Sequence, residues 1–129
     1  PAVVAAFRAT LEELEEASLL LHVVDITHPK SAQQGLTVDD TLGQLGLAQK
    51  RRVTAFNKAD LLVSPDGVLR QAQDSAGAED VIRRYDRDMA QRGLAGAAIS
   101  ATRGWGLDKL VKLLDRELGD VMAQSQEVS

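Results

Sequence analysis

The chain has 129 residues, which leaves room for a single domain. It has no cysteine, which excludes disulfides and thiolate metal sites. A formal net charge of −4 argues against a broad nucleic-acid surface, and we expect no DNA binding. No apolar run approaches the roughly 20 residues that a membrane span needs, and no signal peptide opens the chain, so we expect no membrane contact and a cytoplasmic location, or an organelle matrix in a eukaryote.

The first predicted elements are an amphipathic helix and a strand. Four apolar residues follow the helical repeat near the start of the chain: Val3, Phe7, Leu11 and Leu14. Residues 19–24 then form an apolar run interrupted only by His22, which predicts a strand buried on both faces. Asp25 follows this run, and we interpret it as a cap at the strand end.

A second helix and a second strand follow. Ser31 is expected to cap a helix over residues 31–45, and Gly46 to close it, because glycine accepts the left-handed conformation that ends many helices. Residues 51–56 are predicted to form a short strand that ends at Asn57. The loop that contains Pro65 leads into a polar stretch to which the sequence assigns no element.

The last third of the chain repeats this alternation. We predict a helix over residues 79–92, a strand over residues 95–99, and a final helix that begins near Leu107 after two glycines. The polar ending over residues 122–129 indicates a disordered tail. Residues 1–121 therefore form the predicted domain.

The alternation of helices with buried strands predicts an α/β fold. In this fold a parallel sheet with right-handed crossovers lies between flanking helices, in three layers. Ligands bind such sheets beyond the carboxyl ends of the strands. The polar residues that follow the second and third strands are therefore the candidate binding site.

The motif Asn57-Lys58-Ala59-Asp60 follows the second strand and has the form Asn-Lys-x-Asp. A carboxylate at Asp60 can accept both hydrogens of a guanine edge, from the ring N–H and the amino group, in a charge-assisted pair of hydrogen bonds. Lys58 would lay its aliphatic stem along the purine face while its ammonium reaches the neighbouring backbone and sugar region. Asn57 would tie the base edge to adjacent loops. A plain polar turn is the alternative interpretation of this motif.

A second motif, Ser100-Ala101, follows the third strand and supports the first interpretation. The backbone N–H of Ala101 would donate to the guanine carbonyl oxygen, and its small side chain lets the backbone approach the base. The Ser100 hydroxyl would brace the loop, with Thr102 close behind. Together the two motifs predict a guanine site formed by Asn57, Lys58, Asp60, Ser100, Ala101 and Thr102.

These motifs resemble the base-recognition motifs of the P-loop GTPase superfamily. Within it, residues 6–13 and 17–25 and the loop at His28-Pro29 resemble HflX-type GTPases, and the likeness weakens over residues 64–94. Trp105 departs from the small or polar residue expected in its turn, and we interpret it as a surface packing residue. The resemblance implies a partial P-loop GTPase G domain that binds GTP or GDP, in a parent protein that hydrolyses GTP and acts on the large ribosomal subunit.

The chain contains no Gly-x-x-x-x-Gly-Lys-Ser/Thr motif, so nothing in it is expected to hold a triphosphate. The resemblance implies that the phosphate-binding loop lies upstream of Pro1 and that Mg²⁺ binds only in an intact parent protein. We therefore expect a piece of a longer protein and assign no catalytic residue and no metal ligand. The chain alone is predicted to have no GTPase activity, because hydrolysis depends on groups that position and neutralise the γ-phosphate.

Two other interpretations remain open. The leading half of a circularly permuted ribosome-assembly GTPase would also run from a Val-Asp strand through Asn-Lys-x-Asp to Ser-Ala. The helix that contains Phe7 favours the HflX type instead. The other alternative is a non-catalytic α/β interaction module, which would show no preference for GDP over ADP.

Overall fold

The computed structural model of the chain describes residues 2–63, 69–71 and 75–128. Within these residues the helices are α1 (Ala2–Glu16), α2 (Ser31–Gln44), α3 (Ser75–Gln91) and α4 (Leu107–Val128). The strands are β1 (Leu20–Asp25), β2 (Arg52–Asn57), β3 (Leu61–Val63), β4 (Leu69–Gln71) and β5 (Gly96–Ala98). Pro65, in the predicted loop, lies outside the described residues.

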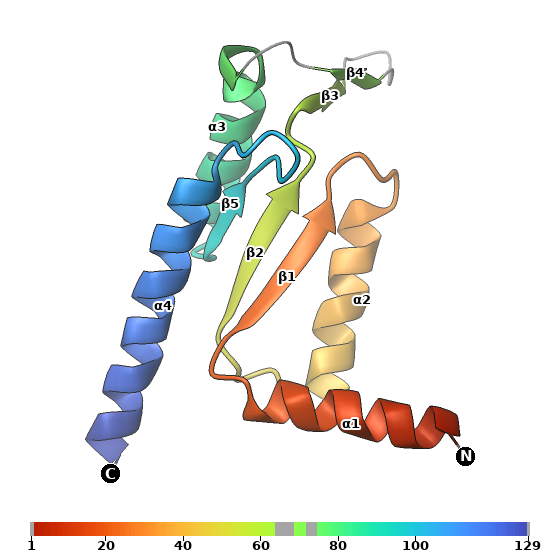
Figure 1. The fold of residues 1–129 in the computed structure, drawn as a ribbon, viewed down its shortest axis with the longest axis vertical. Coiled ribbons are helices and arrows are strands. Elements are labelled where there is room, and N and C mark those ends of the chain that lie inside the picture. The colour runs from red at the N-terminus through yellow and green to blue at the C-terminus, as the bar shows by residue number, and fades with distance from the viewer. Residues whose placement is uncertain (1, 64–68, 72–74, 129) are drawn as a thin grey trace.

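A parallel sheet is formed by three of the strands, in the order β1-β2-β5 (Figure 1). Strands β1 and β2 pair along their whole length, and Asp25 stands opposite Asn57 at the end of this pairing. Strand β5 ends at the same level, where Ala98 stands opposite Phe56. The loops that follow all three strands therefore begin at one edge of the sheet. The α/β fold with a parallel sheet is confirmed.

Helix α4 packs on one face of this sheet. Side chains alternate between the two faces of a strand, and the residues of β2 and β5 that face α4 have no exposed surface: Val53, Ala55 and Ala97. Leu110 of α4 and Ile99 complete this cluster. The core is thus aliphatic, in keeping with an aromatic content of 3%.

Helix α3 covers the opposite face. Phe56 alternates with Ala55 along β2, so it faces away from α4, and its ring lies against Tyr85 of α3 with 4.9 Å between the ring centroids. Met89 of α3 packs on Gly96, where an added Cβ would lie 2.7 Å from the Met89 sulfur. Helices on both faces give the three layers that the sequence predicts.

The prediction that the first strand is buried on both faces is wrong. Leu21 and Val23 of β1 are 47% and 56% exposed. They stand opposite Val53 and Ala55 and therefore face the α4 side of the sheet. Helix α4 packs on β2 and β5 rather than on β1. An apolar run indicates a strand, but it does not say which element covers each face.

The ends of three helices also differ from the prediction. Helix α3 begins at Ser75, four residues before the predicted start at residue 79. Lys30 occupies the cap position of α2, without a side-chain hydrogen bond, and Ser31 is the first helical residue. Gly46, with a φ of 74°, follows the helix end as predicted. Helix α4 continues to Val128, through most of the segment that we expect as a disordered tail. Alanine, glutamine and glutamate there favour a helix, and no glycine or proline interrupts them.

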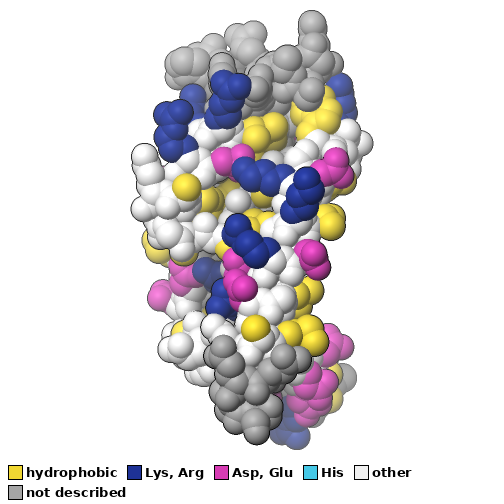
Figure 2. All heavy atoms as spheres, turned by 90° about the vertical axis from the view of Figure 1, so that its left-hand side faces the viewer, with side chains coloured by type: hydrophobic (Ala, Val, Ile, Leu, Met, Phe, Trp, Pro, Cys, Tyr) yellow, Lys and Arg dark blue, Asp and Glu magenta, His cyan; other side chains and the backbone are white. Residues whose placement is uncertain are grey.

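A side chain of α3 caps the backbone edge of β5 that faces away from β2. Asp86 accepts a hydrogen bond from the backbone N–H of Ala98 at 3.4 Å, and Lys109 of α4 forms an ion pair with the same carboxylate. A charged group at a strand edge discourages pairing with another chain. Figure 2 shows this side of the molecule, where Lys and Arg side chains are interspersed with Asp and Glu. No helix among the described residues is both long and apolar enough to cross a bilayer.

Candidate functional site

The loops that follow β2 and β5 are joined by a buried hydrogen bond. The Ser100 hydroxyl donates to the Asp60 carboxylate, with 2.9 Å between Oγ and Oδ1. Ser100 has no exposed surface and Asp60 is only 6% exposed. The Asp60 carboxylate therefore lies at the base of the junction between the loops, and the neighbouring loop fixes its orientation.

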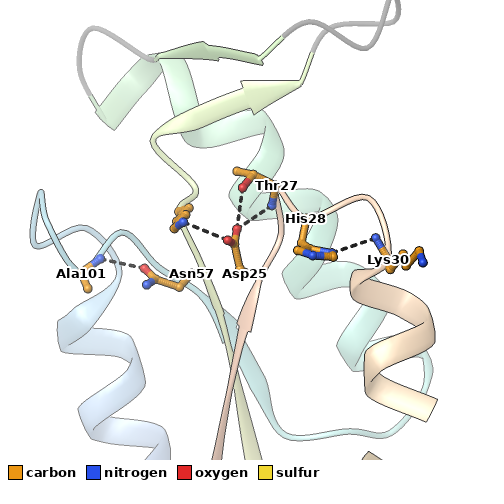
Figure 3. A network of polar contacts seen from close by, with 7 residues as sticks. Asp25, Thr27, His28, Lys30, Asn57 and Ala101 are labelled. Carbon is orange, nitrogen blue, oxygen red and sulfur yellow. Dashed lines mark hydrogen bonds and ion pairs between the residues drawn. The ribbon is translucent and has the colours of Figure 1, made fainter. Parts of the chain in front are cut away.

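Asn57 makes a second link between the same loops. Its Oδ1 accepts a hydrogen bond from the backbone N–H of Ala101 at 3.0 Å (Figure 3). The backbone N–H of Ala59 also donates to the Ile99 carbonyl at 2.9 Å. The donor that the sequence analysis assigns to guanine thus has a partner within the protein. The junction brings together four of the predicted residues: Asn57, Asp60, Ser100 and Ala101.

The loop after β5 is a closed turn. Ser100 and Trp105 exchange two backbone hydrogen bonds, of 2.9 and 3.1 Å. The Arg103 N–H donates to Ser100 Oγ at 3.2 Å, and its guanidinium lies 4.6 Å from the centroid of the Trp105 ring, a cation–π contact. Trp105 therefore shapes the turn that carries Ala101, which goes beyond the surface packing expected from the sequence.

Lys58 has an unusual backbone conformation. Its φ is 74°, in the left-handed region that non-glycine residues seldom occupy. Its ammonium donates to the Asp25 carboxylate, with 2.8 Å between Nζ and Oδ2. The sequence analysis expects this ammonium to reach the neighbouring backbone and sugar region, and the contact with Asp25 adds a partner from the end of β1.

Asp25 is held from a second side by Thr27. The Thr27 N–H and hydroxyl both donate to Asp25 Oδ1, at 2.9 and 2.6 Å (Figure 3). The hydrogen bond from Lys58, followed by that from the Thr27 hydroxyl, lowers the pKa of Asp25 from its ordinary value of 3.8 to about 2. The carboxylate is therefore charged at neutral pH. A strand-end cap accounts for the Thr27 contacts, whereas the contact with Lys58 could be found only from the parallel register of β1 and β2.

The site has a buried base and an exposed rim. Lys58, Ala101 and Thr102 are exposed at the rim, above the buried Asp60 and Ser100. The Thr102 hydroxyl lies 3.4 Å from Ser100 Oγ. The site therefore offers a ligand a buried carboxylate, which has acceptor capacity beyond the one bond from Ser100, and next to it an exposed backbone amide and a long aliphatic stem.

No three His, Asp or Glu side chains in the described part of the chain form a group that could bind a metal ion.

No protein-family model matches the chain. Among curated proteins, the chain is similar to the GTPase HflX of Lacrimispora saccharolytica, at 34% identity over 113 residues, and to that of Caldanaerobacter subterraneus, at 34% over 117 residues. The GTPase HflX of Magnetococcus marinus is 32% identical over 126 residues. These similarities cover 88%, 90% and 98% of the chain but only 22%, 22% and 25% of the respective relatives.

The similarity spans the candidate site. A matched stretch of 113 residues in a chain of 129 includes residues 57–60 and 100–102 wherever it begins. The α/β fold and the two joined loops are consistent with these relatives, each of which has the name GTPase HflX. The chain therefore belongs to the HflX-type GTPase family, and it spans about a fifth to a quarter of the length of the curated relatives that it matches.

Proposed function

We propose that the chain is the guanine-reading part of a GTP-binding domain and that it binds GTP and GDP through the loops after β2 and β5. One observation carries this proposal: the buried Asp60 carboxylate, oriented by Ser100, lies at the same loop junction as the exposed backbone of Ala101. Guanine presents two adjacent donors and a carbonyl acceptor on one edge. The junction offers the complementary groups.

In the proposed complex, Asp60 accepts hydrogen bonds from the guanine ring N–H and amino group. Adenine lacks that amino group and presents a ring acceptor to the carboxylate, which leaves buried charge without a partner and costs several kcal/mol. The Ala101 N–H, at 3.0 Å from Asn57 Oδ1, is shared between Asn57 and the guanine carbonyl oxygen. The Lys58 stem covers one face of the purine.

We further propose that the protein containing this chain hydrolyses GTP and acts on the large ribosomal subunit, as the resemblance to HflX-type GTPases implies. The chain covers about a fifth of the HflX relatives, and the phosphate-binding and Mg²⁺-binding groups belong to the remaining part. The chain alone therefore does not hydrolyse GTP. Relatives with the name GTPase HflX favour this arrangement over a circularly permuted GTPase.

The proposal is tested by comparing GDP and ADP as ligands. The dissociation constants are measured by calorimetry with the longest natural protein that carries this chain. We expect GDP to bind more tightly by a factor on the order of 10⁴, because a site built to pair with specific donors rejects an analogue that lacks them. Equal affinities for the two nucleotides would refute guanine recognition and favour the interaction module.

A further inference from the structure

A polar network connects the loop after β1 to the proposed guanine site. Asp25 is the last residue of β1, Lys58 directly follows the adjacent parallel strand β2, and Asp25 stands opposite Asn57 in the register. The backbone N–H of Ile26 extends this pairing to the Asn57 carbonyl at 3.2 Å. The Asp25 carboxylate then bonds the Lys58 ammonium at 2.8 Å. The loop after β1 is thus attached to the Asn-Lys-x-Asp motif by both backbone and side chain.

Lys58 is a residue for which such an attachment matters. Its side chain is 47% exposed, and a long exposed lysine side chain normally samples many rotamers. A ligand that must fix this side chain loses affinity, whereas a side chain fixed beforehand removes that loss. Its left-handed φ of 74° sets the direction in which the side chain leaves the backbone.

Asp25 is itself fixed before any ligand binds. Both hydrogen bonds from Thr27, at 2.9 and 2.6 Å, fall on Oδ1, which leaves Oδ2 directed to Lys58 (Figure 3). The carboxylate therefore has one orientation with respect to the ammonium. None of these contacts involves Asp60 or Ala101, the groups proposed to read the base edge.

We propose that Asp25 is a positioning residue for nucleotide binding, whose carboxylate holds the Lys58 ammonium so that the lysine stem is preset against the face of the purine. This inference rests on the proposed guanine site. Because Asp25 acts on the face of the base and not on its edge, it raises the affinity for GDP and xanthosine diphosphate alike. It does not change the preference between them.

The first test is Asp25→Asn in the longest natural protein that carries this chain. Asparagine keeps the size of the side chain and can still accept from Thr27, but it has no charge for the ammonium. We expect GDP affinity to fall about 3- to 10-fold, the range for a partly exposed charged hydrogen bond, with no change in the ratio of GDP to xanthosine diphosphate affinity. Asp39→Asn, which removes an exposed ion pair with Arg52, is the matched control and leaves both affinities unchanged.

The second test asks whether Asp25 acts through Lys58. In a Lys58→Met background, which keeps an apolar stem and removes the ammonium, Asp25→Asn should cause no further loss of GDP affinity. The same loss in both backgrounds would overturn the inference, and so would full GDP affinity in the single Asp25→Asn variant. Thr27→Val keeps the Asp25 charge and removes the 2.6 Å bond, so it should give a smaller loss of the same kind.

These outcomes separate this inference from the proposed function. If the unaltered protein shows no preference for GDP over ADP, the guanine site fails and the role of Asp25 fails with it. If that preference is present and neither Asp25→Asn nor Thr27→Val weakens GDP binding, only the role of Asp25 is overturned. Thermal unfolding of each variant identifies any loss that results from misfolding.

Discussion

A buried carboxylate is stable only where its oxygens find hydrogen-bond donors. Asp60 is 6% exposed, and the donor that it receives from the neighbouring loop is the Ser100 hydroxyl. The same hydroxyl oxygen accepts the N–H of Arg103 at 3.2 Å. One small polar side chain therefore both orients the acceptor for the base and holds the turn that carries Ala101.

Ser100→Ala should weaken both stability and nucleotide binding. It removes the donor to a buried charge, which costs about 1–3 kcal/mol of unfolding free energy, and it frees the orientation of Asp60. The measurements are chemical denaturation and the dissociation constant for GDP. Thr37→Val is the control, because the exposed Thr37 hydroxyl donates to the Gln33 carbonyl within α2, away from the site. Equal stability of the Ser100→Ala and unaltered proteins would contradict this role.

At the scale of the elements, the turn between β5 and α4 depends on how closely two backbone segments approach. Gly104 and Gly106 both have a φ of 74°. An added Cβ at Gly106 would lie 2.4 Å from the Ala98 carbonyl oxygen, whereas a Cβ at Gly104 would meet nothing within 4 Å. Glycine is therefore needed at position 106 both because of the close contact and because of the left-handed backbone. At position 104 only the left-handed backbone favours glycine.

This difference predicts two distinct costs. Gly104→Ala should lose about 1 kcal/mol of unfolding free energy, the cost of a left-handed alanine. Gly106→Ala should lose at least about 3 kcal/mol, because the backbone must also move away from the new methyl group. Urea denaturation of both variants checks the difference. Similar losses in the two variants would show that the close approach at Ala98 does not constrain the turn.

Much of the element order could be predicted from the sequence, because the apolar residues of long segments such as α4 recur with the helical period. The meeting of Asp60 and Ser100, forty positions apart, could be predicted because parallel strands end at one edge of the sheet. The antiparallel pairing of β3 with β4 could not be predicted, since strands of three residues are too short to show an alternating pattern. The attachment of Lys58 to Asp25 also escaped prediction, because it follows from the parallel register of β1 and β2, which places Asp25 opposite Asn57.

At the scale of the whole molecule, apolar side chains of both α1 and β1 are exposed among the described residues. Val3 and Phe7 of α1 are 80% and 59% exposed, and Leu21 and Val23 of β1 are 47% and 56% exposed. In the part of the chain that the structure describes, strand β1 pairs on one side only, with β2. Exposed apolar side chains and an unpaired strand edge both favour association with other surfaces.

The 129-residue chain by itself should therefore self-associate at micromolar concentration. Sedimentation velocity checks this, and a Phe7→Ser, Val23→Thr double variant should shift the distribution toward monomer. The control is Val111→Ser on α4, which removes an apolar side chain that is 62% exposed but distant from α1 and β1 in sequence. A strictly monomeric chain over that concentration range would argue that the exposed residues of α1 and β1 do not form an interaction surface.

The most direct measurement on the proposed function is the nucleotide preference of Asp60→Asn in the longest natural protein that carries this chain. Xanthine has a carbonyl group where guanine has its amino group, so an asparagine amide can donate where the carboxylate accepts. We expect GDP affinity to fall about 100-fold, the equivalent of one charge-assisted hydrogen bond, and xanthosine diphosphate to become the preferred ligand. Unchanged GDP affinity, or an equal loss for both nucleotides, would contradict the assignment of Asp60 to the guanine edge.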